Sequence, residues 1–312
     1  SLNLFRFFNK FHPDFRDYDK GGMVFITYDL FHSVLNNISD ERRAGLIHLI
    51  DNTEYLIVDE AHSSVADTYE DCVNAFINND KTKIVGLSAT PYREDVEAGE
   101  SLIRLYSGNL IKMTNIDGEE LDNPIRYLQE IGALANVDIK ILETGYTLTG
   151  NNKGSILKTL AENASRNKKI VNQIQVASDL REKTLVFACT KEHVLALYIL
   201  CKSRDISVAF ITGDVLQSDR LSIMEEFNDG ATDVLINLNI LSTGVDLPNV
   251  NRLILTRPIK SSIEYSQIVG RALRGPLNGG NKKNTIVNIQ DNIDYFSDIS
   301  LLYNGFKNSW EN

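Results

Sequence analysis

The sequence predicts an α/β fold built from two units, each with a mainly parallel β-sheet. Three observations support this prediction: short apolar runs rich in β-branched residues recur along the chain, stretches with helical spacing separate them, and a polar stretch near the middle divides two similar halves. Alternation of strands with helices is typical of parallel sheets. The length of 312 residues is sufficient for two domains with separate cores.

Strands in the first half are expected at residues 22–28, 55–60 and 83–90, which read GMVFITY, YLIVDE and KIVGLSAT. Their apolar character is typical of strands that are buried on both faces. A helical pattern, SDERRAGLIHLI, lies between the first two strands and opens with Ser39, a suitable N-cap residue. The first half therefore predicts a sheet with helical connections.

The second half repeats this scheme with five expected strands, at residues 184–190, 208–214, 233–239, 252–258 and 285–291. Helical stretches lie between them, for example at 191–203 and 217–230. Glycine and asparagine follow a strand-like run in the middle of the chain, and we expect a linker there, at residues 149–154. The predicted domains are therefore residues 1–148 and 155–312.

The composition limits the classes of protein to consider. No apolar run has the length of a membrane span, and we expect a cytoplasmic location, or a nuclear one in a eukaryote. Cys72, Cys189 and Cys201 are scattered without paired spacing, which predicts small core residues instead of a disulfide framework or a zinc site. The net charge of -10 argues against a strong general attraction to phosphate polymers, although a local cleft can still be positive.

Asp59 and Glu60 stand at the end of a predicted buried strand. Open α/β sheets bind ligands outside the carboxyl ends of their strands, where two neighbouring carboxylates can hold Mg2+ and activate a water molecule. The alternative interpretation is a strand that ends in a solvated acidic turn. For an isolated pair of acidic residues that alternative would be favoured.

Other polar groups follow the later strands in a regular order. Arg271 and Arg274 stand three residues apart on one predicted helix, where two guanidinium groups can converge on one phosphate. A solvated helix edge is the alternative for these arginines. The remaining polar candidates are Ser88 and Thr90 after one strand, Thr243, Gly244 and Asp246 on a loop, and Gln267 on the helix of the arginines.

These motifs resemble those of superfamily 2 helicases and translocases of the DEAD/DEAH-box type. VDEAH is similar to motif II, LSATP to motif III, STGVD to motif V and QIVGRALR to motif VI, in the same order along the chain. GLSATPYRED and GRALRG are most similar to the motor subunits of restriction enzymes, such as the type III res subunit, and to xeroderma pigmentosum group B-type DNA helicases. The resemblance implies two RecA-like domains of the P-loop NTPase type that close on ATP and Mg2+.

The resemblance also implies a role for each matching residue. Asp59 would hold Mg2+ through water, Glu60 would act as the general base, and Arg271 and Arg274 would contact the γ-phosphate. The remaining implied roles are nucleotide binding by Gly244 and Asp246, contact across the cleft between Gln267 and His62, and coupling of closure to nucleic acid by Ser88 and Thr90.

Nucleic acid would contact both domains according to the same resemblance. Thr27 and Tyr28 match the phosphate contact of the first domain, and Gly213 and Thr243 match those of the second. Hydroxyls and backbone amides suit a motor that binds phosphates of any sequence. Tyr28 is equally well explained as a core residue of its strand. DNA is favoured over RNA through the restriction resemblance alone, and nuclease or methyltransferase subunits are candidate partners.

One motif of the family has no match. The Gly-rich loop G-x-x-x-x-G-K-[ST], which cradles the phosphates of ATP, is absent from the sequence. We expect the chain to be a fragment of a longer motor, with a first domain truncated at its N-terminus, uncovered apolar faces on the sheet and little hydrolysis of its own. The alternatives are a degenerate nucleic-acid clamp or scaffold without ATPase activity, and a different phosphotransfer or nucleotide-sugar enzyme.

Overall fold

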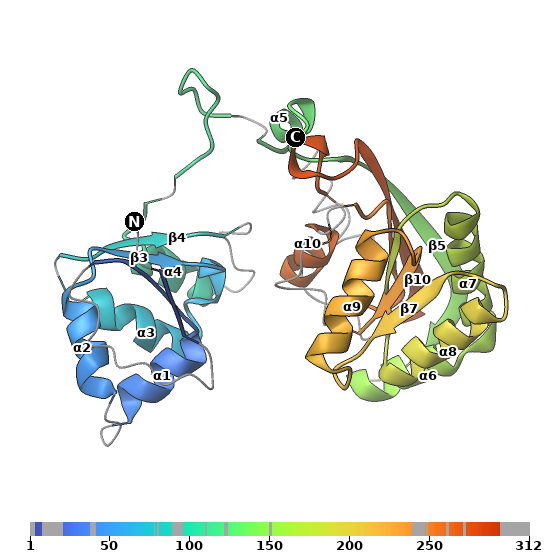
Figure 1. The fold of residues 1–312 in the computed structure, drawn as a ribbon, viewed down its shortest axis with the longest axis horizontal. Helices are drawn as coiled ribbons and strands as arrows, with labels where there is room; N and C mark the ends of the chain where they lie inside the picture. Colours follow the sequence, from blue (N-terminus) through green and yellow to red (C-terminus); the bar gives the residue numbers. More distant parts are fainter. Residues whose placement is uncertain are drawn as a thin grey trace. The chain divides into compact units, whose positions relative to one another are not determined.

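The computed structural model describes residues 4–7, 21–37, 42–77, 79, 81–88, 96–109, 111–121, 124–149, 152–238, 247, 249–259, 262–270 and 273–293. The chain forms two compact units, residues 1–111 and residues 112–312. Figure 1 shows the fold of each. None of the helices in the described segments is long and apolar enough to cross a membrane.

The first unit contains two pairs of parallel strands and a layer of helices. The strands are β1 (Leu4–Phe7) with β2 (Met23–Ile26), and β3 (Tyr55–Val58) with β4 (Lys83–Gly86). The helices are α1 (Tyr28–Asn36), α2 (Arg43–Asp51), α3 (Asp67–Ile77) and α4 (Val96–Leu105). Apolar residues of α1, α2 and α3 pack against Val24, Ile26, Leu56 and Ile84 of the strands, on one side of them (Figure 1).

The strands of the first unit are covered on one face. Their apolar runs predicted burial on both faces, whereas the missing Gly-rich loop predicted uncovered apolar faces. Met23 and Phe25 of β2 and Tyr55 and Ile57 of β3 are 42 to 58% exposed. Because side chains alternate between the two faces of a strand, cover on one side leaves every second residue exposed. The described part of the first unit thus carries an apolar sheet face in contact with solvent.

The second unit contains a six-stranded parallel sheet in the order β5-β10-β9-β6-β8-β7. Its strands are β5 (Asn136–Leu148), β6 (Thr184–Phe187), β7 (Val208–Ile211), β8 (Val234–Asn237), β9 (Arg252–Leu255) and β10 (Lys283–Ile293). Its helices are α5 (Pro124–Glu130), α6 (Lys153–Glu162), α7 (Ala164–Asp179), α8 (Lys191–Lys202), α9 (Gln217–Asn228) and α10 (Ser262–Gly270). The predicted α/β class with parallel sheets is confirmed.

Both faces of this sheet are buried. Leu185 and Phe187 of β6 belong to the cluster that α9 and α10 cover, whereas the alternate residue Val186 belongs to the cluster under α7 and α8 (Figure 1). All four residues of each of the central strands β6, β8 and β9 are buried, as the β-branched runs predicted. The three cysteines are buried, as expected for small core residues.

The boundary between the units differs from the predicted linker at residues 149–154. Strand β5 pairs with β10 over residues 136–143 and again at Thr147 and Leu148 after a register shift, so it belongs to the second sheet. The predicted linker is the short connection from β5 to α6, where the Asn152 side chain accepts a hydrogen bond from the amide of Ser155 and caps the helix. The boundary between the compact units lies at residues 111 and 112 instead.

Candidate nucleotide site

The candidate site lies where β3 and β4 end side by side. Asp59 and Glu60 follow β3 directly, and Leu87 and Ser88 follow β4. The Leu87 amide donates to the Val58 carbonyl at 2.8 Å, and the Ala61 amide donates to the Leu87 carbonyl at 2.9 Å. The acidic pair is therefore fixed at the carboxyl ends of two parallel strands, which is the predicted position.

Glu60 adopts a left-handed backbone conformation, with φ 50° and ψ 47°. A residue with a Cβ pays about 1–2 kcal/mol for this conformation. The turn it makes leads into a short 3-10 helix, Ala61–Ser63, and the Glu60 amide donates to the Asp59 Oδ1 at 2.9 Å. Strain of this kind in a non-glycine residue is found often at functional sites.

His62 connects the two strand ends. Its side chain is buried, and its Nδ1 lies 3.3 Å from Glu60 Oε2 and 3.1 Å from Ser88 Oγ. The His62 ring therefore contacts both the Glu60 carboxyl group and the Ser88 hydroxyl group. His62 thus orients the Glu60 carboxylate and brings the predicted coupling residue Ser88 to the same point.

An open cleft of about 580 Å3 lies above these groups, lined by Asp59, Glu60, Val85, Gly86, Leu87, Ser88 and Ile111. Carboxylate and hydroxyl oxygens are suitable for Mg2+, which binds proteins through one or two carboxylates and keeps several waters. The described lining contains no lysine or arginine to balance a triphosphate. No cluster of three or more His, Cys, Asp or Glu forms within the described segments, so Mg2+ would depend on substrate phosphates and water.

A tight contact beneath the cleft escaped the sequence analysis. A Cβ on Gly86 would lie 2.7 Å from the Tyr106 ring and 2.8 Å from the Ala61 Cβ. The Tyr106 hydroxyl lies 3.0 Å from Ser64 Oγ. Tyr106 therefore supports the turn that carries Glu60 from below, and no motif in the sequence identifies it.

Thr27 and Tyr28 lie at the start of α1. The sequence predicted that Tyr28 belongs to the preceding strand, and this prediction is wrong, because β2 ends at Ile26. The Thr27 side chain accepts a hydrogen bond from the Leu30 amide at 3.4 Å and caps the helix. The Tyr28 ring is half-buried and stacks on Tyr69, with ring centroids 4.1 Å apart. Thr27 remains an exposed candidate for phosphate contact, while packing accounts for the ring of Tyr28.

Gly213 lies on an exposed loop after β7, with open space where a Cβ would point. Arg220 of α9 fixes this loop, because its Nη2 donates to the Gly213 carbonyl at 2.7 Å and its Nε donates to the Val215 carbonyl at 2.9 Å. Lys191 at the start of α8 forms an ion pair with Asp214 in the same loop. Arg220 and Lys191 were not singled out from the sequence.

Gln267 lies half-buried on α10, as predicted, but Arg274 does not share that helix. Helix α10 ends at Gly270, and Arg274 instead forms a β-bridge with Leu134. The backbone leaves the helix because residues 273–277 form hydrogen bonds with residues 132–135. The prediction of two arginines on one helical face is therefore wrong for Arg274. Other candidates, namely Thr90, Thr243, Gly244, Asp246 and Arg271, lie outside the described residues.

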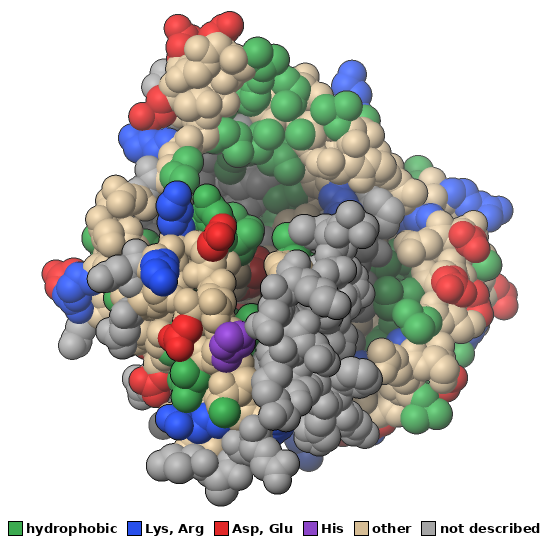
Figure 2. All heavy atoms as spheres, turned by 60° about the vertical axis from the view of Figure 1, so that its left-hand side comes forward, with side chains coloured by type: hydrophobic (Ala, Val, Ile, Leu, Met, Phe, Trp, Pro, Cys, Tyr) green, Lys and Arg blue, Asp and Glu red, His purple; other side chains and the backbone are tan. Residues whose placement is uncertain are grey.

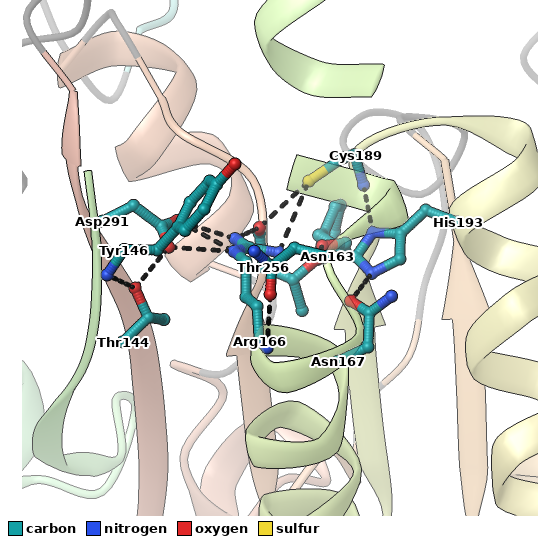
Figure 3. A network of polar contacts seen from close by, with 10 residues as sticks. Thr144, Tyr146, Asn163, Arg166, Asn167, Cys189, His193, Thr256 and Asp291 are labelled. Carbon is teal, nitrogen blue, oxygen red and sulfur yellow. Dashed lines mark hydrogen bonds and ion pairs between the residues drawn. The ribbon is translucent and has the colours of Figure 1, made fainter. Parts of the chain in front are cut away.

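A buried polar network joins the carboxyl ends of strands in the second unit (Figure 3). Arg166 of α7 binds both carboxylate oxygens of Asp291 in β10, with side chains 0% and 1% exposed. Arg166 also donates to the carbonyl of Thr256, and the Thr144 hydroxyl donates to Asp291 at 2.6 Å. The network fixes α7 to β5, β9 and β10.

His193 continues this network on the other side of α7 (Figure 3). Its Nδ1 accepts from the amide of Cys189 at 3.1 Å, and its Nε2 lies 2.9 Å from Asn167 Oδ1. Burial, with the nearby Arg166 charge, lowers the pKa of His193 from 6.5 to about 3. Burial also raises the pKa of the Cys189 thiol. His193 is therefore a packed histidine that burial keeps neutral.

Comparisons with known proteins agree with this architecture. The family model for the type III restriction enzyme res subunit matches residues 7–93, and the model for the helicase conserved C-terminal domain matches residues 165–276. IRC3 of Saccharomyces cerevisiae, whose name describes an ATP-dependent helicase, is 31% identical over 231 residues, which cover 70% of this chain and 32% of IRC3. Helicase 22 of a Sulfolobus islandicus filamentous virus is 26% identical, with 80% and 45% covered. The chain thus spans less than half of these two relatives.

Solved structures show the same fold. The HsdR subunit fragment of a type I restriction enzyme from Vibrio vulnificus has a TM-score of 0.61 at 20% identity, with 92% of this chain and 52% of that chain covered. Dbp5 from S. cerevisiae, bound to RNA and ADP BeF3, has a TM-score of 0.59 at 14% identity, with 99% and 68% covered.

The parallel sheets, the acidic pair at a strand end and the two family matches define a helicase-type protein with RecA-like domains. The chain belongs to superfamily 2 of helicases. Within that superfamily it is related to the motor subunits of restriction enzymes.

Proposed function

We propose that this protein is a motor that hydrolyses ATP with Mg2+ and moves along or unwinds nucleic acid, with DNA favoured over RNA. The observation that carries the proposal is the open cleft at the strand ends that Asp59, Glu60 and Ser88 line, with the buried His62 in contact with Glu60 and Ser88. A solvated acidic turn would need neither the strained backbone of Glu60 nor a buried histidine holding its carboxylate.

The roles follow from the chemistry of these groups. Asp59 would hold Mg2+ through water, and Glu60, oriented by His62, would accept a proton from the attacking water. Arg271 and Arg274 of the second unit would stabilise charge on the γ-phosphate, with Gln267 close by and Gly244 and Asp246 at the nucleotide. Ser88 and Thr90 would transmit closure to the nucleic-acid contacts.

Nucleic acid would be held by local contacts instead of a broad basic surface. Figure 2 shows lysine and arginine side chains mixed with acidic ones over the visible described surface, and the net charge is -10. Thr27, Gly213 and Thr243 would supply hydroxyls and backbone groups for phosphate. Relatives of the same fold have been solved with RNA and with DNA bound. We further propose that nuclease or methyltransferase subunits of a restriction-type complex are partners of this protein, and that it is located in the cytoplasm.

ATP hydrolysis by this chain, with Mg2+ and with or without duplex DNA, tests the proposal. We expect weak nucleotide binding and little turnover, because the sequence contains no phosphate-binding Gly-rich loop, and DNA-stimulated turnover in the full-length protein. A full-length protein that binds DNA without turnover would favour the alternative of a nucleic-acid clamp or scaffold. Robust turnover by this chain that Glu60→Gln abolishes would show an unconventional phosphate site.

A further inference from the structure

The segment after the predicted arginine motif packs unusually closely on another backbone segment. A Cβ on Gly275 would lie 2.3 Å from the Gly132 carbonyl oxygen, and 2.7 and 2.8 Å from the carbonyl carbons of Leu134 and Ala133. These three neighbours are backbone atoms, so they cannot rotate away as a flexible side chain would. Only glycine fits at position 275 without moving one of the two segments.

Backbone hydrogen bonds hold the two segments in register on both sides of Arg274. The Ala135 amide donates to the Leu273 carbonyl at 2.8 Å, and the Gly275 amide donates to the Ala133 carbonyl at 3.1 Å. The bridge between Leu134 and Arg274 lies between these two bonds. The main chain of Arg274 therefore has one fixed position relative to residues 132–135.

A second glycine and an asparagine complete the contact. A Cβ on Gly280 would lie 2.0 Å from the Arg274 carbonyl oxygen, and the Gly280 amide donates to the Gly275 carbonyl at 3.0 Å. The exposed Asn278 donates through Nδ2 to the Ala133 carbonyl at 2.8 Å. We call residues 132–135 and 273–280 the glycine clasp. Within it, the main chain of Arg274 pairs with Leu134 and lies close to Gly280.

We propose that the glycine clasp positions Arg274 for contact with the γ-phosphate, and that Gly275 is a positioning residue for ATP hydrolysis. This inference rests on the proposed function, in which Arg274 stabilises the transferred phosphoryl group. Residues 132–135 lie directly before β5, and the clasp therefore ties the start of the second sheet to the arginine.

The expected effect of a methyl group at Gly275 follows from the distances. One segment must shift by about 0.7 Å before the contact of 2.3 Å reaches 3.0 Å, the lower limit for real Cβ contacts. A misplacement of about 1 Å at a catalytic group costs about 100-fold in rate. We expect Gly275→Ala to lower kcat by about 30- to 100-fold and to change KM for ATP less than about twofold, since an arginine acting on the transition state contributes mainly to kcat.

The test compares variants of the full-length protein in steady-state ATP hydrolysis with DNA. Gly154→Ala is the matched control, because the added Cβ lies 3.4 Å from the Asn152 Oδ1 at the start of α6, and it should keep wild-type kcat. In the Arg274→Gln background, Gly275→Ala should cause little further loss of kcat, because the group it positions is already gone.

The inference would be overturned if Gly275→Ala lowered kcat by the same factor with and without Arg274→Gln. It would also be overturned by a wild-type kcat in Gly275→Ala, and either result would leave the proposed function intact. If Gly275→Ala does not fold, Asn278→Ala provides the test. We expect Asn278→Ala to lower kcat about threefold at unchanged KM. A wild-type kcat in Asn278→Ala would contradict the inference. A wild-type protein that hydrolyses no ATP would overturn the proposed function, and the inference with it.

Discussion

Glu60, the proposed general base, has an unfavourable backbone conformation. Its φ of 50° suits glycine, which has no Cβ to conflict with the following carbonyl. We expect Glu60→Gly to be more stable to unfolding than Glu60→Ala by about 1 kcal/mol, since both remove the carboxylate but only glycine relieves the strain. Urea unfolding of the two variants measures the difference.

A matched pair of substitutions at another position separates strain from intrinsic residue preference. Glu70, which is half-buried within α3, serves because its backbone is helical. Glu70→Gly should be less stable than Glu70→Ala by about 1 kcal/mol, which is the opposite order. The same order at both positions would contradict the left-handed conformation of Glu60.

His193 makes stability depend on pH. Its folded pKa of about 3 lies below the ordinary value of 6.5, so between these values the unfolded chain binds the proton and the folded chain does not. The stability that His193 contributes is fully present above the unfolded pKa of 6.5 and is lost as the pH falls towards the folded pKa of about 3. From pH 7 to pH 5 we expect this group to remove about 2 kcal/mol of unfolding free energy.

Urea unfolding at pH 7, 6 and 5 checks this expectation. His193→Gln should show a flatter dependence on pH by about 2 kcal/mol over that range, whatever its stability at pH 7. An unchanged pH dependence in His193→Gln would show that His193 is not buried as a neutral group.

At the scale of elements, the ion pair of Arg166 and Asp291 fixes α7 to the sheet. Because both side chains are buried, Asp291→Asn leaves a buried guanidinium without its counter-charge, and we expect a loss of about 3–5 kcal/mol. The exposed pair of Arg126 and Glu130 is the control, where Glu130→Gln should cost less than about 1 kcal/mol. Equal losses in urea unfolding would refute the structural role of the buried pair.

The sequence predicted some elements better than others for physical reasons. The starts of β3 and β4 were placed correctly from their apolar runs, whereas the predicted strands ran to residues 60 and 90 and the observed ones end at Val58 and Gly86. The end of α10 could not be placed, since the helical pattern continues past Gly270 and only pairing with residues 132–135 draws the chain away. The placement of β5 depends on β10, which lies about 140 residues later.

Within the site, the sequence identified the groups to which we assign chemistry but not the residues that pack against them. Asp59, Glu60, His62 and Ser88 were found through motif and position, and the structure brings them together. Tyr106 and the glycine clasp were missed, because a close contact between distant backbone segments leaves no local pattern.

At the scale of the whole molecule, the two units differ in how much of their strands' surface is covered. The sheet of the second unit is buried on both faces, while the described strands of the first unit expose one apolar face. An uncovered apolar face favours association with other protein surface. The account of ATP chemistry nevertheless depends on the small group of side chains at the end of β3.

The most direct test of that account is ATP hydrolysis by the full-length protein and its Glu60→Gln variant, measured with Mg2+ and DNA beside nucleotide affinity. We predict that Glu60→Gln keeps the affinity for ATP and lowers kcat by at least about 100-fold, because the amide cannot accept the proton of the attacking water. Wild-type kcat in the variant would contradict the assignment of Glu60 and with it the proposed motor site.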